Sequence, residues 1–292
     1  MSRWNLLAPM ALLLSSAPAR AQNPDPAGRL ASAERSVVEA IAREGLAATL
    51  SNTLARDGAL LWPGAPLVVG PDSARVLLLA QRGTLDTLQL SWQPLGLELS
   101  SDAGFGITWG VALAIPPSRN VRYGRYIAAW RLSGDSWKLA AFVAIGIVPP
   151  AATVIPPELA AVHYAPLTPA GPGGPLVAAD FAFARLAGDS GAALAFERFA
   201  ASDGVTLGGL LNRGPAAIGR ALRGGPPSHW AWYPVLVGVA ASRDLGFTVG
   251  HSEIKPEGGP ATYGKYLTIW RRLPGGELRF VIDGGNVRPP GS

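Results

Sequence analysis

Side chains able to move a proton stand close together near the end of the chain. His251 and Glu253 are two residues apart in an otherwise apolar run. On an extended strand, residues i and i+2 point to the same side, so both would share a face with Val249. A histidine beside a carboxylate can act as an acid–base pair if that face lines a cavity. The Lys-Pro-Glu segment at 255–257 is typical of an exposed turn, so the alternative is that both groups are solvated.

Asp283 is a third candidate for catalysis, at the end of the apolar stretch 280–282. A carboxylate enclosed by apolar side chains has a raised pKa, as a general base near neutral pH requires. The segment 284–286, Gly-Gly-Asn, follows directly, and an aspartate often fixes such a turn through its own oxygens. Both roles stay open at this stage.

Three aromatic residues are candidates for ligand binding. Tyr266 and Trp270 are four residues apart and share one side of a strand, while Tyr263 and Lys265 take the other side. Trp232 opens another apolar run. Together Trp232, Tyr266 and Trp270 could line a pocket, and the alternative is that they pack in the core.

Other kinds of site are not expected. The three histidines, at 163, 229 and 251, are far apart in the sequence and cysteine is absent, so no metal site is predicted. Neither a Gly-x-Ser-x-Gly elbow nor a phosphate-binding Gly-Lys-Ser/Thr loop occurs, and no cofactor is expected. The 25 basic and 20 acidic residues are scattered, which argues against nucleic acid as a partner.

The elements that would position these residues are duplicated. Tyr-Gly-Arg-Tyr at 123–126 returns as Tyr-Gly-Lys-Tyr at 263–266, an offset of 263 − 123 = 140 residues. Gly-Ile-Thr-Trp-Gly at 106–110 returns as Gly-Phe-Thr-Val-Gly at 246–250. A period this long indicates two copies of one domain. We place the first at 33–148 and the second at 176–288, joined by a proline-rich linker at 149–175.

In each copy, helical patterns precede a run of strands, the order typical of an α+β fold. The first copy has a helical stripe over 33–54, interrupted at Gly45, with Ser32 as the expected N-cap. Gly70-Pro71 opens another helix with Asp72 as its cap. Strands are predicted at 88–92, 96–100, 104–115, 123–132 and 137–145. The second copy repeats this order, with helices at 178–187 and 191–200 and strands at 232–240, 245–254, 263–272 and 278–283. We expect the helices to cover one face of a curved antiparallel sheet.

These motifs resemble those of the nuclear-transport-factor-2-like superfamily. The resemblance rests on Asp-Gly at 203–204, Gly-Pro at 214–215, Leu-Gly-Phe-Thr-x-Gly at 245–250, Tyr-Gly-Lys-Tyr-x-x-x-Trp-Arg at 263–271 and Leu-x-Phe-Val-Ile-Asp at 278–283. More narrowly, the second copy is similar to ketosteroid-isomerase-like and polyketide-cyclase-like domains with a cystatin-like fold. This likeness implies two cone-like domains in tandem, each with a pocket at its open end. Members include enzymes and non-enzymatic binding modules, so the resemblance does not select a chemistry.

The N-terminal segment 1–21 has the features of a signal peptide. Arg3 precedes a mostly apolar run from Leu6 to Leu14, and Ala-Arg-Ala at 19–21 is a small-x-small cleavage site. We predict cleavage after Ala21 and export to the periplasm or the cell exterior. The apolar run is shorter than the about 20 residues that span a bilayer, and no second run follows, so no integral membrane segment is predicted.

The two copies differ at the residues able to do chemistry. At a constant offset, Val-Ala-Leu at 111–113 aligns with His-Ser-Glu at 251–253, and Phe-Val-Ala at 142–144 aligns with Ile-Asp-Gly at 282–284. Any first pocket should therefore be apolar, and a polar site should lie in the second copy. The leading expectation is a binding or scaffold module for a small apolar ligand, with the copies paired as a pseudo-dimer or the chain forming a homodimer. The alternative is an isomerase, lyase or cyclase that uses Asp283 or His251 with Tyr266.

Overall fold

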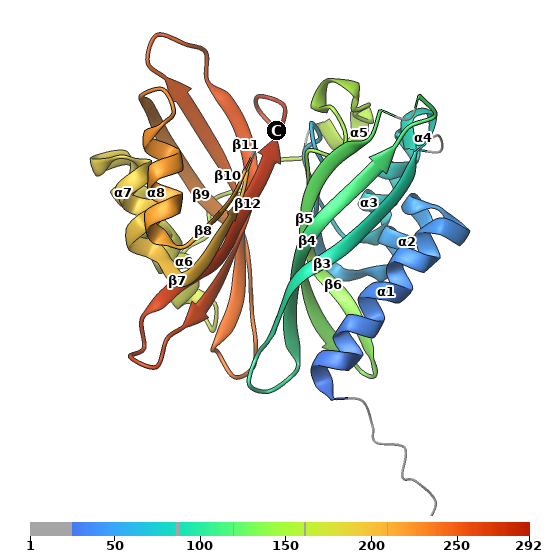
Figure 1. Cartoon of the computed structure of the whole chain (residues 1–292), viewed down its shortest axis with the longest axis horizontal. Helices are drawn as coiled ribbons and strands as arrows, with labels where there is room; N and C mark the ends of the chain where they lie inside the picture. Colours follow the sequence, from blue (N-terminus) through green and yellow to red (C-terminus); the bar gives the residue numbers. More distant parts are fainter. Residues whose placement is uncertain (1–24, 86–87, 119, 161, 209) are drawn as a thin grey trace, which may run out of the picture.

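The computed structural model describes residues 25–292 except 86–87, 119, 161 and 209. The predicted signal peptide, 1–21, lies outside the described residues. Two units of the same architecture follow one another along the chain (Figure 1). The first consists of α1 (Pro26–Glu44), α2 (Leu46–Thr53), β1 (Leu54–Leu61), β2 (Leu67–Val69), α3 (Pro71–Ala80), α4 (Arg82–Leu85), β3 (Gln89–Leu99), β4 (Phe105–Ile115), β5 (Arg122–Ser133) and β6 (Ser136–Ile145).

The second unit repeats this order. It consists of α6 (Gly174–Ser190), α7 (Ala192–Phe199), β7 (Ala200–Leu207), β8 (Leu211–Arg213), α8 (Pro215–Arg223), β9 (Ser228–Val239), β10 (Leu245–Pro256), β11 (Thr262–Arg272) and β12 (Leu278–Val287). Between the units, the proline-rich segment contains a short 3-10 helix, Pro150–Ala152, and α5 (Pro157–Ala160). This segment is anchored on both units, because the Gln81 side chain bonds the Val154 backbone and the Leu167 N–H donates to the Pro234 carbonyl at 2.9 Å.

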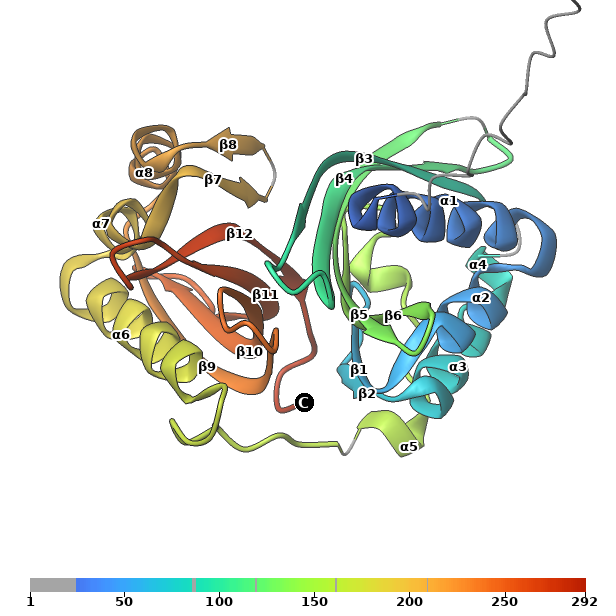
Figure 2. The same ribbon diagram turned by 90° about the horizontal axis from the view of Figure 1, so that it is seen from below.

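Each unit has the predicted α+β, cone-like fold, with a six-stranded sheet curved around its helices (Figure 2). The strand orders are β2-β1-β6-β5-β4-β3 and β8-β7-β12-β11-β10-β9. The sheets are mixed rather than purely antiparallel as predicted, since β1 pairs with β6, and β7 with β12, in parallel. Side-chain periodicity reveals a strand but not the direction of a partner about 80 residues away, so this pairing was not visible in the sequence.

Helix beginnings differ from the sequence prediction in two places. The break at Gly45 is present, with φ of 85°, but α1 begins at Pro26 and not after Ser32. Proline suits a first helical position, and the Asp25 carboxylate caps the helix by accepting from the Gly28 N–H at 2.6 Å. In α3 the cap is Gly70, with φ of 86°, and Asp72 lies in the first turn instead.

The two strands predicted at 88–92 and 96–100 are one strand, β3, with a bulge between Pro94 and Gly96.

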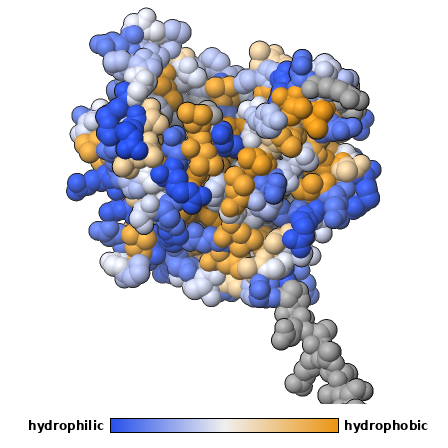
Figure 3. Space-filling model, viewed as in Figure 1, coloured by the Kyte–Doolittle hydropathy of each residue, from blue (hydrophilic) through white to orange (hydrophobic). Residues whose placement is uncertain are grey.

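The two sheets pack on each other through the faces that their helices leave open (Figures 1 and 2). Apolar residues are visible along the middle of the molecule, where the units meet (Figure 3). One buried cluster combines Ile127 and Val143 of the first sheet with Leu267 and Val281 of the second. The two sheets therefore share one hydrophobic core, which lies between the units.

Several polar contacts between the units come in reciprocal pairs. The Ser101 N–H donates to Asp244, and the Ser242 N–H donates to Asp102, each at 2.8 Å. Likewise, the Lys265 ammonium donates to the Ala65 carbonyl at 2.7 Å, and the Arg125 guanidinium donates to the Gly208 carbonyl at 2.8 Å. Such exchange of equivalent contacts is the mark of a two-fold interface, here formed within one chain.

Candidate functional site

A buried carboxylate binds a tyrosine at the same place in both units. In the second unit, Asp180 of α6 accepts a hydrogen bond from the Tyr266 hydroxyl at 3.0 Å and another from Trp232 Nε1 at 2.8 Å. Thr248 also hydrogen bonds Asp180, and its hydroxyl accepts from Trp270 Nε1 at 2.9 Å. Burial raises the pKa of Asp180 to about 6, against the effect of these hydrogen bonds.

The first unit holds the counterpart of this network. Glu34 of α1 accepts from the Tyr126 hydroxyl at 2.6 Å and from the Thr108 hydroxyl at 2.9 Å. Trp130 Nε1 donates to Thr108 at 2.9 Å, as Trp270 does to Thr248. The repeated Thr, Tyr and Trp of the two motifs are therefore bonded to one another and to an acidic residue on the first long helix of each unit.

Sequence reasoning missed both acidic residues, although a signal was present. Each replaces an apolar residue on the buried stripe of its helix, which reads Leu30, Glu34, Val37, Ile41 in α1 and Leu176, Asp180, Phe183, Ala187 in α6. A charged residue at a core position in both copies is unusual, because a buried carboxylate needs hydrogen-bond donors. The pattern indicates a partner but not which residues supply it.

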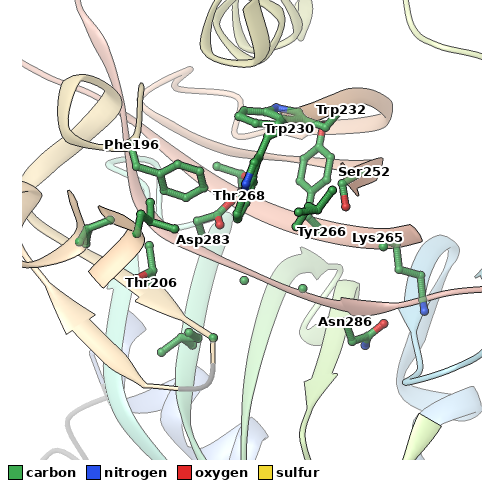
Figure 4. Close-up of a pocket in the computed structure, with 18 of the residues that line it drawn as sticks. Phe196, Thr206, Trp230, Trp232, Ser252, Lys265, Tyr266, Thr268, Asp283 and Asn286 are labelled. Atoms are coloured by element: carbon green, nitrogen blue, oxygen red, sulfur yellow. Dashed lines mark hydrogen bonds between the residues drawn. The ribbon is translucent and has the colours of Figure 1, made fainter. Parts of the chain in front are cut away.

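A cavity of about 510 Å³ opens in the second unit between its helices and the concave face of its sheet (Figure 4). Most of its wall is aromatic or aliphatic. Its described lining residues are Phe183, Phe196, Thr206, Leu207, Gly208, Leu210, Asn212, Ile218, Ala221, Leu222, Trp230, Trp232, Ser252, Ile254, Thr262, Gly264, Lys265, Tyr266, Thr268, Asp283, Gly284, Gly285, Asn286 and Val287.

Asp283 is the acidic residue of this lining. It lies opposite Thr268 in the β11–β12 ladder, and the Thr268 hydroxyl donates to its carboxylate at 2.6 Å (Figure 4). Burial raises the pKa of Asp283 to about 7; the Thr268 hydrogen bond acts in the opposite direction, and the negative charge of Asp180 adds to the rise. Burial and Asp180 also hold the pKa of the Tyr266 hydroxyl well above its ordinary value, so Tyr266 stays protonated. The cavity thus contains one carboxyl group that titrates near neutrality and a phenolic hydroxyl that stays protonated.

The first unit has almost no room at the equivalent place, where about 10 Å³ is free. The ladder pairs Ala128 with Phe142 where the second unit pairs Thr268 with Asp283. Phe142 packs against Trp92, with ring centroids 5.6 Å apart. Trp62, the residue after β1, is 1% exposed, whereas the residue after β7 is Gly208. Bulky side chains therefore fill the first cone. Its interior is largely apolar, as expected, but the pocket expected at its open end is closed.

The constant offset of 140 misaligned Asp283. It set Asp283 against Val143, whereas the ladders set it against Phe142, an offset of 283 − 142 = 141. The reason is the hairpin between β11 and β12, which is one residue longer than its counterpart between β5 and β6. Val143 points to the interface between the units, so the residue that takes the place of Asp283 inside the first cone is Phe142.

His251 and Glu253 lie on the other face of the sheet. The residues that alternate with them, Ser252 and Ile254, line the cavity. Glu253 is exposed and His251 is 3% exposed, packed between Tyr164 of the linker and Tyr233. Burial and the nearby positive charges of Arg288, Lys265 and His163 lower the pKa of His251 to about 4. The two residues do not form an acid–base pair in the cavity, and only Glu253 is solvated.

The aromatic candidates divide as well. Trp232 and Tyr266 line the cavity, while Trp270 lies below it in the core with no exposed surface. Tyr266 and Lys265 point to opposite faces as predicted, and Lys265 sends its ammonium away from the cavity to the carbonyls of Ala65 and Val287 (Figure 4). Asp57 and Asp203, which precede glycine in both copies, form surface ion pairs with Arg131 and Arg271.

Within the described ranges, no group of three or more His, Cys, Asp or Glu side chains is close enough to hold a metal ion. In that same part of the chain, no helix combines the length and apolar character needed to cross a membrane.

Comparisons with known proteins give likenesses of fold. No family model and no curated protein matches the chain. Among solved structures, an NTF2-like protein with a cystatin-like fold from Novosphingobium aromaticivorans is 23% identical, with a TM-score of 0.33, covering 40% of this chain and 82% of that one. A ketosteroid isomerase-like protein from Erwinia carotovora atroseptica is 17% identical, with a TM-score of 0.36, over 43% and 99%. An NTF-2 like protein of unknown function from Shewanella oneidensis is 11% identical, with a TM-score of 0.36, over 41% and 98%. Each match spans about the length of one unit.

Proposed function

We propose that this protein binds a small, largely apolar molecule in the cavity of its second unit. The observation that supports this most directly is the contrast between the units: about 510 Å³ is open in the second and about 10 Å³ in the first. Ligand sites in proteins commonly enclose about 300–1,000 Å³ with a few polar groups in an apolar wall. The second cavity fits this description, with Asp283, Tyr266 and Ser252 as polar groups among aromatic residues.

The first unit serves as a support in this proposal. Asn286, which lines the cavity, donates to the carbonyls of Leu61 and Ala144 in the first unit at 2.9 Å and 2.7 Å. Gly208 at the lip of the cavity accepts from Arg125 at 2.8 Å. The filled cone is rigid because side chains of a close-packed core cannot shift without loss of contacts. It therefore holds one wall and the lip of the open cone.

The test is whether closing the cavity abolishes binding. We would isolate the protein from its own host and identify any retained molecule by native mass spectrometry. Gly208→Trp copies Trp62 of the first unit, and a Cβ atom added at Gly208 meets no atom within 4 Å. This variant should lose the molecule while its circular dichroism is unchanged. Retention of the same molecule by a folded Gly208→Trp protein would contradict the proposed site. An exposed substitution, Leu194→Ala, is the control and should retain it.

A second candidate function is acid–base catalysis of the isomerase or lyase type in the same cavity. The specific support is that Asp283, with a pKa near 7, and Tyr266, kept protonated, line one cavity. The Asp283 carboxylate would take a proton from a carbon beside a carbonyl group. The Tyr266 hydroxyl would turn from Asp180 to donate its hydrogen bond to the developing oxyanion, and the proton would return to another carbon. His251 has no part in this version, because it lies on the opposite face.

Substitution separates the two candidates once a substrate is known. Loss of a general base lowers turnover by about 10²–10⁴-fold, and we expect this of Asp283→Asn. Turnover by Asp283→Asn equal to that of the native protein would remove Asp283 as the base. Binding of the same compound by the variant would show that the site itself survives.

Export is also a proposal, supported by the composition of residues 1–21. The mature chain from the native host should begin at Gln22. Mass spectrometry of the intact protein and of its N-terminal peptide checks this, and an unprocessed chain in the cytoplasm would overturn it.

A further inference from the structure

We infer that the molecule bound in the second unit carries an organic cation, such as a protonated amine, which Asp283 holds against the indole rings of Trp230 and Trp232. This inference rests on the proposed function and names the chemical class of the ligand. Two observations support it: the Asp283 carboxylate lines the cavity, and the Lys265 ammonium points away from it.

The lining has an acidic side chain without a cationic partner. Among the described lining residues, the ionisable acid is Asp283 and the base is Lys265. The Lys265 ammonium is bonded to Ala65 and Val287 on the opposite side of the sheet, and Figure 4 shows it pointing away from Asp283. The hydroxyl of Thr268 is the group whose contact stabilises the Asp283 carboxylate. A carboxylate enclosed by apolar walls and bonded to one neutral donor is satisfied best by a cation that enters with the ligand.

Among the described residues, the neighbouring elements add no cation close to Asp283. From α6, Asp180 contributes a second carboxylate, and from β11 the Tyr266 hydroxyl is neutral. On α7 and α8, Glu197 and Arg223 pair with each other at the surface at 2.6 Å. Arg125 of the first unit reaches the lip, where it is bonded to the Gly208 carbonyl. The interior around Asp283 is therefore acidic or neutral.

The aromatic wall suits the same kind of ligand. Trp230 and Trp232 line the same cavity as Asp283, and each has part of its surface exposed (Figure 4). Indole is the aromatic side chain that attracts cations most strongly through its face. An ammonium bonded to Asp283 would meet these rings, while the apolar body of the ligand fills the space lined by Phe196, Ile218 and Leu222. A ligand carboxylate would meet a like charge here.

Protonation provides an independent readout. The pKa of Asp283 is raised to about 7, so at pH 7 about half of the empty sites hold a proton on this group. A cation favours the ionised carboxylate and lowers that pKa, so binding should release roughly half a proton per site at pH 7. A neutral ligand gives no such release.

The test compares three probes with one aromatic body: 1-naphthylmethylammonium, 1-naphthylmethanol and 1-naphthoate. Titration calorimetry on the mature chain at pH 7 measures each affinity. We expect the ammonium to bind at least about tenfold more tightly than the alcohol, with the carboxylate weakest. Repeating the ammonium titration in two buffers of different ionisation enthalpy measures the proton release.

Two variants assign the effect to Asp283. Asp283→Asn should reduce ammonium binding to the level of the alcohol and leave alcohol binding unchanged, which also shows that the cavity is intact. Asp189→Asn removes the same charge from an exposed position of α6 and should leave the preference in place. If Asp283→Asn does not fold, the proton release of the native protein decides the question.

The outcomes separate the inference from the proposal beneath it. Binding of the alcohol with no preference for the ammonium, or ammonium binding without proton release, overturns the cationic ligand and leaves the binding site standing. A preference that survives in folded Asp283→Asn also overturns it. If none of the three probes binds the native protein more strongly than it binds Gly208→Trp, whose cavity is closed, the proposed function and the inference are both overturned.

Discussion

Asp283 occupies in the second sheet the place that Phe142 fills in the first. Each stands opposite the residue two positions after the Tyr of the repeated motif, Thr268 in one unit and Ala128 in the other. The open cone therefore has a hydrogen-bonded pair at this place, Thr268 with Asp283, and the filled cone has an apolar pair, Ala128 with Phe142. The Trp62 side chain, which Gly208 lacks, completes the filling.

Copying the first unit into the second should make the protein more stable and unable to bind. The double variant Thr268→Ala with Asp283→Phe removes a buried carboxyl group and its donor together, and it buries a phenyl ring in their place. We expect the free energy of unfolding to rise by about 1–3 kcal/mol, because an apolar group replaces a costly buried acid. Urea denaturation measures this. A decrease in stability would show that the second cone cannot accept the packing of the first.

The contribution of Asp283 and Asp180 to stability should fall as pH rises from about 4 to about 7, while that of His251, whose pKa is lowered to about 4, rises over the same range. The folded pKa values of Asp283 and Asp180, about 7 and about 6, lie above the unfolded value of 3.8. The folded state therefore binds more protons in this range, so the stabilisation is complete below the unfolded pKa and is lost through the folded one. For Asp283 alone the change over this range is on the order of 3 kcal/mol. Urea midpoints at several pH values, compared between the native protein and Asp283→Asn, should show a shallower slope in the variant; equal slopes would contradict the raised pKa.

Trp232 and Trp92 should differ in the cost of replacement by phenylalanine. They hold the same place in the two units, but Trp232 Nε1 donates to Asp180 at 2.8 Å, whereas Trp92 Nε1 has no hydrogen-bond partner among the described residues. Both variants lose similar packing, and Trp232→Phe also removes a hydrogen bond to a charged group. We expect it to cost about 1–3 kcal/mol more than Trp92→Phe. Thermal and urea unfolding of the two single variants measures the difference, and equal costs would mean that the bond adds nothing.

Asp102 and Asp244 should contribute about equally to the contact between the units. Each accepts from a backbone N–H of the other unit at 2.8 Å. We expect Asp102→Ala and Asp244→Ala each to lower the free energy of unfolding by about 1–2 kcal/mol. The pKa of each is lowered by hydrogen bonds, against the effect of burial, so this contribution is present above the unfolded value and is lost as pH falls through the folded pKa. Acid titration of the unfolding midpoint checks both the size and the sign, and strongly unequal losses would argue against the two-fold arrangement.

Much of the fold could be read from local patterns. The repeat with its offset of 140 identified two units, and the helices, strands and the break at Gly45 followed from periodicity and from glycine. Cap residues and the direction of the β1–β6 and β7–β12 pairs were predicted wrongly, because they depend on competing caps and on distant strands. The alignment of Asp283 with Val143 failed through a single added residue in a hairpin.

Local sequence patterns predicted the candidate site only in part. Alternation along β10 established that His251 and Glu253 share a face, and that Ser252 takes the other, but not which face lines a cavity. That choice belongs to tertiary structure, because one face of the sheet meets the helices and the other meets the second unit. The bond between Asp180 and Tyr266 joins residues 86 positions apart, which no periodicity relates.

The amino-acid sequence by itself determined two copies of an α+β unit and placed the chemical difference between them in the second. Tertiary structure decided which of the candidate groups meet: Asp283 with Thr268 in an open cone, Tyr266 with a buried Asp180, and His251 in the interface between units. The physical reason is that side-chain types and spacing specify strands and helices, whereas an enclosed cavity depends on the volumes that several distant elements bring to one place.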